Sequence, residues 1–190
     1  MTPVGVVLAR VSVALVLGVV LAGCSGGGGG GPGATRRSST STSTTSTAVG
    51  DATSCADPRP PREKSFDFNP DWKARDALVG VTSADYLGGA ASFQDADAAT
   101  LGALLGERFM DPFDRQNAAP TTWAIFKFLC RHPGVTAAGY VIERARPDYR
   151  ASLDGVWSPT IDAGLEGDAR ALCRRASQKS FEGRVDCFWD

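Results

Sequence analysis

The stretch Pro120-Thr-Thr-Trp-Ala-Ile-Phe-Lys-Phe-Leu-Cys130 predicts a buried central helix around which the rest of the fold is organised. Proline is accepted in the first turn of a helix, because the N–H that it lacks would have no partner there. Apolar residues cover most of the helix circumference, which is typical of a buried helix. They are Trp123, Ile125, Phe126, Phe128, Leu129 and Cys130. The turn residues His132-Pro133-Gly134 end the helix.

Two alternating segments follow this helix and predict a β-hairpin. They span 136–145 and 149–157, and Arg146-Pro147-Asp148 between them has turn chemistry. In the second segment one face carries Tyr149, Ala151, Leu153 and Trp157, and the other carries Arg150, Ser152 and Asp154. We therefore expect an antiparallel pair with one face on the core and one face in water.

Two amphipathic helices are also expected, one before the hairpin in the sequence and one after it. The first follows Asp95 or Asp97 as its N-cap and ends before Pro112, although its two glycines each weaken it by ~1 kcal/mol. Its apolar stripe is Ala98, Leu101, Leu104, Leu105 and Phe109. The second follows Asp168 as its N-cap. Its apolar stripe is Ala169, Leu172, Cys173 and Ala176.

Shorter segments complete the expected order of elements. A strand is expected over 65–69, a short helix over 71–78 and a last strand over 181–189. The glycines and small residues of 82–93 support no assignment. Together the elements predict an α+β fold, in which a small antiparallel sheet is packed with about three helices.

The N-terminus carries a separate signal. An apolar run from Val11 to Ala22 follows Arg10 and leads into Leu21-Ala22-Gly23-Cys24. As a helix this run would rise only about 18 Å, well short of the roughly 30 Å hydrocarbon core of a bilayer. A secretory signal is therefore favoured over the alternative, a retained transmembrane helix.

These residues resemble the lipobox signal peptide of bacterial lipoproteins, of the actinobacterial type. The resemblance covers residues 1–24 and implies that Cys24 is acylated after cleavage between Gly23 and Cys24. It implies a protein anchored by lipid to the extracytoplasmic face of the cell membrane, with residues 1–23 removed as the signal peptide. More than one acyl chain gives stable anchoring.

Residues 24–54 predict a disordered tether. The glycine run Gly26–Gly31 and the Ser/Thr tract 38–47 have no apolar side chains whose burial could offset the entropy of ordering. Such a linker reaches about 30 Å on average. The Ser/Thr tract either carries O-glycans or is a bare polar linker. Residues 55–190 then have the usual length of a single globular domain.

The four cysteines other than Cys24 predict two disulfides in this exported domain, with three pairings possible. Cys173 lies on the buried stripe of its helix and Cys187 on the apolar face of the next strand, so we favour Cys173–Cys187, which leaves Cys55–Cys130. A zinc site is the alternative, but no C-x₂-C pair is present and His132 is the only histidine. We therefore expect no metal and no other cofactor.

The polar loop 111–117 holds the densest group of functional side chains. Asp111, Asp114, Arg115 and Asn117 offer carboxylates, a guanidinium and an amide that suit a sugar or a cation. The alternative, which we favour, is an ordered connection between two helices. The loop lacks the acid spacing and central glycine of an EF-hand.

Other candidates for catalysis are weaker. His132 suits a general base but also suits a helix C-terminus, where a cation is favoured. The G-x-S-x-G elbow of serine hydrolases is absent, and disulfide-bonded cysteines supply no thiolate. A carboxylate pair for glycoside hydrolysis stays open among Glu107, Glu143, Glu166 and Glu182. The four tryptophans suit sugar stacking, although core positions are the simpler interpretation.

The function favoured by the sequence is a non-enzymatic binding or interaction module of the cell envelope. It would contact membrane lipid through acylated Cys24 and an envelope protein or glycan through its domain. A small envelope hydrolase acting on wall polymer or glycan, and a structural accessory of a membrane complex, are the alternatives. The formal net charge of −1 and the lack of a basic stripe argue against nucleic acid as a partner.

Overall fold

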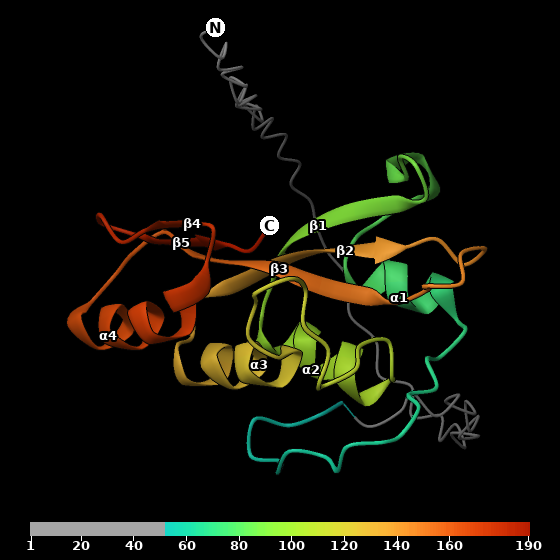
Figure 1. Ribbon diagram of the computed structural model, residues 1–190, viewed down its shortest axis with the longest axis horizontal. Helices are drawn as coiled ribbons and strands as arrows, with labels where there is room; N and C mark the ends of the chain where they lie inside the picture. Colours follow the sequence, from blue (N-terminus) through green and yellow to red (C-terminus); the bar gives the residue numbers. More distant parts are fainter. Residues whose placement is uncertain (1–51) are drawn as a thin grey trace, which may run out of the picture. The chain divides into compact units, whose positions relative to one another are not determined.

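The computed structural model describes residues 52–190. The predicted signal peptide, Cys24 and the tether up to Asp51 lie outside the described residues. Figure 1 shows the arrangement of the helices and strands.

A five-stranded antiparallel sheet is the framework of the domain, with strand order β1-β2-β3-β5-β4. The strands are β1 (Ala90–Ala96), β2 (Thr136–Ile142), β3 (Ala151–Ser158), β4 (Gln178–Ser180) and β5 (Val185–Phe188). The helices are α1 (Trp72–Leu78), α2 (Ala98–Gly106), α3 (Thr122–Arg131) and α4 (Ala163–Leu172), with 3₁₀ turns η1 (Ser83–Asp85) and η2 (Cys173–Arg175). Helices α2, α3 and α4 lie on one side of the sheet (Figure 1). The predicted α+β class is confirmed.

Helix α3 is the central buried helix that its sequence predicts. Its side chains at Ile125, Phe126, Phe128 and Leu129 are almost fully buried. The helix is capped by Thr121, whose hydroxyl oxygen accepts the N–H of Ala124 at 3.2 Å, and it ends at His132. The core that it completes lies between the helices and the inner face of the sheet.

Helix α2 begins at the cap expected from the sequence, because the carboxylate of Asp97 accepts the N–H of Thr100 at 2.8 Å. Gly102 in this helix has a packing role. The N–H of Thr53 donates to the carbonyl of Gly102 at 2.9 Å, and a Cβ at this position would lie 2.4 Å from the carbonyl oxygen of Thr53. The glycine therefore lets the start of the domain lie directly on the helix.

A β-bulge in β3 places the side chain of Trp157 on a different face of the sheet from the one expected. Ala138 pairs with Gly155 while the next residue, Gly139, pairs with Leu153, so Asp154 is an extra residue in β3. A bulge of this kind shifts the alternation of side chains beyond it. Leu153 faces the core, whereas Trp157 lies on the opposite face and is 39% exposed. The expectation that these two side chains share a face is wrong.

Several elements also differ from the sequence predictions. The segment 65–69 forms no strand, and strand β1 begins within the segment 82–93 that received no assignment and runs through Asp95, one of the two expected caps of α2. The expected last strand 181–189 is shorter, because β5 covers Val185–Phe188 alone. Helix α4 begins earlier than expected, because Asp162 and not Asp168 caps it by accepting the N–H of Leu165 at 2.8 Å.

Both disulfides join the pairs favoured by the sequence argument. Cys55 is bonded to Cys130 across 75 residues, and Cys173 is bonded to Cys187 across 14. The first bridge connects the N-terminal segment of the domain to α3, and the second connects the end of α4 to β5.

A buried polar network fastens α1 to the hairpin of β2 and β3. Arg75, which is fully buried, donates to the carboxylate of Asp76 and to the carbonyls of Ile142 and Arg150. Tyr86 bonds to both members of the ion pair, and its pKa is raised to about 12 by burial and by its hydrogen bond to Asp76. Because its donors and acceptors are partnered, the network stabilises this corner of the fold.

Candidate functional site

An irregular segment stands away from the body of the domain and encloses a pocket against it. We call residues 56–68 the strap. It begins after the disulfide at Cys55 and ends before Asn69, whose N–H donates to the carbonyl of Arg108 at 3.1 Å. Figure 1 shows the strap, coloured cyan, passing beneath α2 and α3 on the side away from the sheet. Between the strap and these helices lies a pocket of about 330 Å³.

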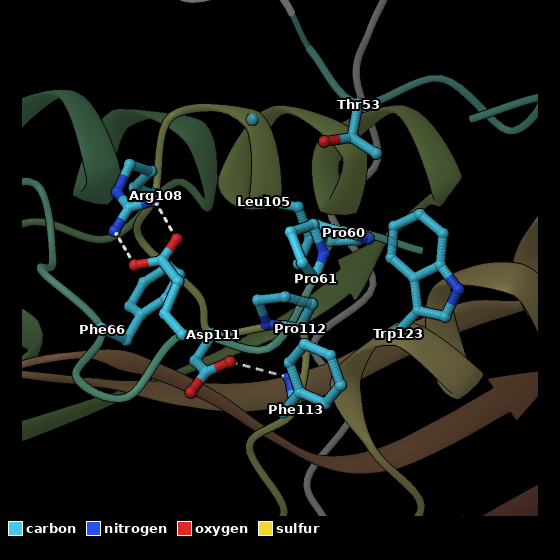
Figure 2. Close-up of a pocket in the computed structure, with 12 residues that line it drawn as sticks. Thr53, Pro60, Pro61, Phe66, Leu105, Arg108, Asp111, Pro112, Phe113 and Trp123 are labelled. Carbon is cyan, nitrogen blue, oxygen red and sulfur yellow. Dashed lines mark hydrogen bonds and ion pairs between the residues drawn. The ribbon is translucent and has the colours of Figure 1, made fainter. Parts of the chain in front are cut away.

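The pocket walls come from four parts of the chain (Figure 2). The strap contributes Pro60, Pro61, Glu63 and Phe66. The end of α2 and the loop after it contribute Leu105, Gly106, Arg108, Asp111, Pro112 and Phe113. Thr53 and Trp123 complete the lining.

Arg108 holds the C-terminal end of the strap. Its guanidinium forms a bidentate ion pair with Glu63, with N–O distances of 2.8 and 2.9 Å, and donates to the carbonyl of Asp67 at 3.0 Å. It also lies over the ring of Phe66, 4.4 Å from the centroid. These hydrogen bonds lower the pKa of the Glu63 carboxyl and raise the pKa of Arg108. One side chain thus fixes three residues of the strap.

Lys127 holds the N-terminal end of the strap. Its ammonium group donates to the backbone carbonyls of Cys55 and Asp57 and lies 5.6 Å from the ring centroid of Trp123. The disulfide Cys55–Cys130 fixes the same end covalently. The strap is therefore attached at both ends, and its proline-rich middle crosses the pocket.

Two arginines of the strap lie over Phe113, which is a residue of the pocket lining. The guanidinium of Arg59 stacks on the ring of Phe113 at 4.0 Å, and that of Arg62 lies 5.5 Å from the same ring. Within residues 52–190 neither guanidinium pairs with a carboxylate. One aromatic ring of the lining therefore has two guanidinium groups beside it that no carboxylate neutralises.

The interior of the pocket has a polar side, which carries the charged groups, and an apolar side. In Figure 2 Arg108, Asp111 and the ring of Phe66 lie on the polar side, and Trp123 and Phe113 lie on the apolar side. Glu63 is paired with Arg108. One carboxylate oxygen of Asp111 accepts the N–H of Phe113 at 2.8 Å. Among the described residues no donor reaches its second oxygen, which is available to a ligand.

The structure separates the members of the predicted polar loop. Asp111 lines the pocket, whereas Asp114 lies near β3, 3.6 Å from Nε of Arg150 and 3.5 Å from the hydroxyl of Ser152. Arg115 and Asn117 are exposed to solvent. Only Asp111 of this group contributes to the pocket.

His132 joins α3 to α4 instead of facing the pocket. Its Nε2 lies 2.8 Å from the carboxylate of Asp168, and its ring packs on Phe128 at a centroid distance of 4.8 Å. The bond to His132, together with the nearby charge of Arg131, lowers the pKa of Asp168. Within residues 52–190 no serine, threonine or free cysteine bonds to His132, so the arrangement is that of a contact between helices.

The remaining candidates for acid–base chemistry, Glu107, Glu143, Glu166 and Glu182, are not among the residues that line the pocket. Glu166 pairs with Arg170 one turn away at 2.6 Å. Burial raises the pKa of Asp154, which sits at the β3 bulge and is not among the pocket residues. In the part of the chain that the structure describes, no three His, Cys, Asp or Glu side chains gather as a metal site.

Sequence reasoning missed most of the pocket residues. Glu63, Phe66, Arg108 and Phe113 belong to separate segments, and only the fold brings them together. The sequence makes Trp123 a candidate for sugar stacking, but favours a core position for it. One signal was present. The proline-rich run at 58–62 directly follows Cys55, and the favoured bridge to Cys130 places that run beside α3.

Comparisons of the chain with protein-family models, with curated proteins and with solved structures find no match. Over residues 52–190, no helix has both the length and the apolar character needed to cross a bilayer.

Proposed function

We propose that this protein is a lipid-anchored binding module of the cell envelope, in which the strap pocket receives the ligand. The observation that carries the proposal is the pocket itself. It combines an apolar wall at Leu105 and Trp123 with one available carboxylate oxygen at Asp111. Concave sites that combine apolar surface with a few placed polar groups are typical of ligand binding.

The same residues favour binding over hydrolysis. An acyl or glycosyl hydrolase needs a nucleophile or a pair of carboxylates aimed at one bond, with a group that transfers the proton. Among the described residues that line this pocket there is no histidine, serine or cysteine, and Glu63 is engaged by Arg108. A role as an envelope hydrolase therefore has less support than a binding role.

The lipid anchor is proposed from Leu21-Ala22-Gly23-Cys24 and is tested separately. We expect mass spectrometry of the mature protein to find an N-terminal Cys24 that carries acyl chains, and detergent phase partition to place the protein with lipid. The variant Cys24→Ala should lose the acyl mass and move to the aqueous phase. An unmodified Cys24, or a mature chain that still begins at Met1, would contradict the anchor.

The binding role is tested with full-length protein and fractions of the cell envelope. Wall polymer, extracted lipid and solubilised membrane proteins are each immobilised, and retention of the protein is measured. We expect one fraction to retain the wild-type protein. The same fraction should not retain the variants Asp111→Asn and Phe113→Ala. Asp148→Asn is the matched control, because Asp148 pairs with Arg146 on the surface away from the pocket residues. Equal retention of all variants, or soluble products released from the wall polymer, would overturn the proposal.

A further inference from the structure

We infer that the strap pocket binds an uncharged saccharide, with a sugar ring seated between its polar and apolar sides. This inference rests on the proposed function, since it names the ligand class of the same pocket. It is carried by three features: the division of the walls, the arrangement of charge around the pocket, and the donor and acceptor atoms that are available.

The division of the walls matches the two kinds of surface on a sugar ring. A pyranose presents C–H groups on its faces and hydroxyl groups around its edge. Trp123 and Phe113 contribute aromatic rings on one side of the pocket, and Asp111 and Arg108 lie on the other, beside the ring of Phe66 (Figure 2). The negative face of an aromatic ring attracts the slightly positive C–H groups of such a ligand. A flat molecule that is apolar on its face and polar on its edge therefore fits both sides at once.

The charges disfavour ions of either sign. Arg59 and Arg62 repel a cation, because their guanidinium groups lie over Phe113 without a carboxylate partner in residues 52–190. The carboxylate of Asp111, which lines the pocket, repels an anion. Arg108 does not compensate an entering anion, because Glu63 already holds its guanidinium at 2.8 and 2.9 Å. A charged ligand of either sign would also lose its hydration, while the attraction of one group is offset by the repulsion of the other.

The available polar atoms suit hydroxyl groups. Asp111 keeps one oxygen bonded to the N–H of Phe113, which restrains the carboxylate, while its second oxygen has no donor among the described residues and is available as an acceptor. A hydroxyl that donates to this carboxylate forms a charge-assisted hydrogen bond, which is stronger than a bond between neutral groups. The volume of about 330 Å³ lies at the lower end of the range for ligand pockets, which indicates a small ligand or a short part of a larger one.

A proline-rich peptide is the competing ligand class, because aromatic grooves also bind polyproline helices. The observations favour it less. Pro60 and Pro61 of the strap already lie in the pocket beside Phe113 and Trp123, so the chain itself supplies the proline surface that such a peptide would bring.

The test uses full-length protein in a detergent without a sugar headgroup, and calorimetry with a series of probes of different charge. The probes are chitotetraose, which is neutral, its deacetylated cationic form, an anionic oligogalacturonate, cellotetraose, maltotetraose and a ten-residue polyproline peptide. We expect a neutral oligosaccharide to bind more tightly than either charged one and to change the fluorescence of the tryptophans. Asp111→Asn and Phe113→Ala should each weaken it about tenfold or more, with Asp148→Asn unchanged.

The outcomes separate this inference from the proposed function. Tighter binding of a charged oligosaccharide, or binding of polyproline alone that both pocket variants weaken, would overturn the saccharide and leave the pocket as a binding site. If the pocket variants bind every probe and every envelope fraction as the wild type does, the proposed function fails as well. Melting temperatures of the variants, measured in the same detergent, show that each is folded before its affinity is compared.

Discussion

Glu63 and Arg108, 45 residues apart in the chain, meet in a bidentate ion pair with N–O distances of 2.8 and 2.9 Å. Glu63 belongs to the strap and Arg108 follows the end of α2, so this pair closes one side of the pocket. Both side chains are partly exposed. The pair therefore acts as a local fastening of the strap, and its contribution to the stability of the whole domain is small.

Replacing Glu63 with Gln should loosen the strap while the domain stays folded. We expect trypsin to cleave after Arg62 and Lys64 faster than in the wild type, with little change in melting temperature, because only the charge of the fastening is lost. Mass spectrometry of the fragments measures the rate. Glu166→Gln, which disrupts an exposed pair within α4, is the control and should leave strap cleavage unchanged. Strap cleavage at the wild-type rate in Glu63→Gln would show that the pair does not hold the strap.

The two disulfides should differ in their sensitivity to reductant. Cys55 is exposed and Cys130 half-buried, whereas Cys173 and Cys187 are buried in the core. Mild reduction of the folded protein, followed by alkylation, should therefore label the first pair before the second. Labelling of Cys173 and Cys187 first would contradict this order.

Removal of each bridge should also cost a different amount of stability. On the chain-entropy argument, the 75-residue separation of Cys55 and Cys130 corresponds to about 4 kcal/mol and the 14-residue separation of the second pair to about 3 kcal/mol. Denaturant unfolding of the paired Cys→Ser variants measures both losses. Because the first bridge also fixes the strap, its loss alone should accelerate cleavage after Arg62.

Replacing each of two helical glycines with alanine should change the stability of the protein in opposite directions. Gly102→Ala places a Cβ 2.4 Å from the carbonyl oxygen of Thr53, so the segment before the strap must move, at a cost of about 1–3 kcal/mol. Gly167→Ala in α4 meets no atom within 4 Å and should stabilise the protein by about 0.5–1 kcal/mol. Denaturant unfolding measures both changes. Equal stabilisation by the two substitutions would show that Thr53 does not pack on α2.

Asp154 should make the protein less stable as pH rises through its titration. Burial raises the pKa of this carboxyl above its unfolded value, so its favourable contribution is present at low pH and is lost above the folded pKa. Asp154→Asn should therefore raise the melting temperature at pH 7 and have little effect at pH 3.

Asp148→Asn is the control of opposite sign. Hydrogen bonds from Arg146 lower the pKa of Asp148, so its contribution is present above its unfolded pKa and lost as pH falls through the folded pKa. This variant should show a slightly lower melting temperature at pH 7 than the wild type. A lower melting temperature for Asp154→Asn at pH 7 would indicate that the ionised carboxylate has a favourable partner.

The elements that could be predicted are those with strong local signals. Helix α3 has apolar residues nearly all round and a sharp stop at His132-Pro133-Gly134, and α2 has a regular apolar stripe after Asp97. The disulfide pairs followed from placing Cys173 and Cys187 on facing surfaces of neighbouring elements. In each case a few adjacent residues carry the information.

The features that escaped prediction depend on distant partners. Strand β1 is built from small residues whose pairing with β2 compensates for weak intrinsic preference. The outward turn of Trp157 depends on one extra residue, Asp154, which no local pattern reveals. The pocket requires Arg108 to reach across to Glu63, so its polar side exists only in the folded chain.

The position of the Cys55–Cys130 bridge determines how a mechanical load on the N-terminus would travel through the domain. A pulling force on the chain before Thr53 would first load the hydrogen bond between Thr53 and Gly102, and would then pass through the covalent bond at Cys55 into α3. The strap starts after Cys55 and so lies outside the direct load path. Tension on the N-terminal segment would thus be borne by the core, and Thr53 is the pocket residue that it would reach directly.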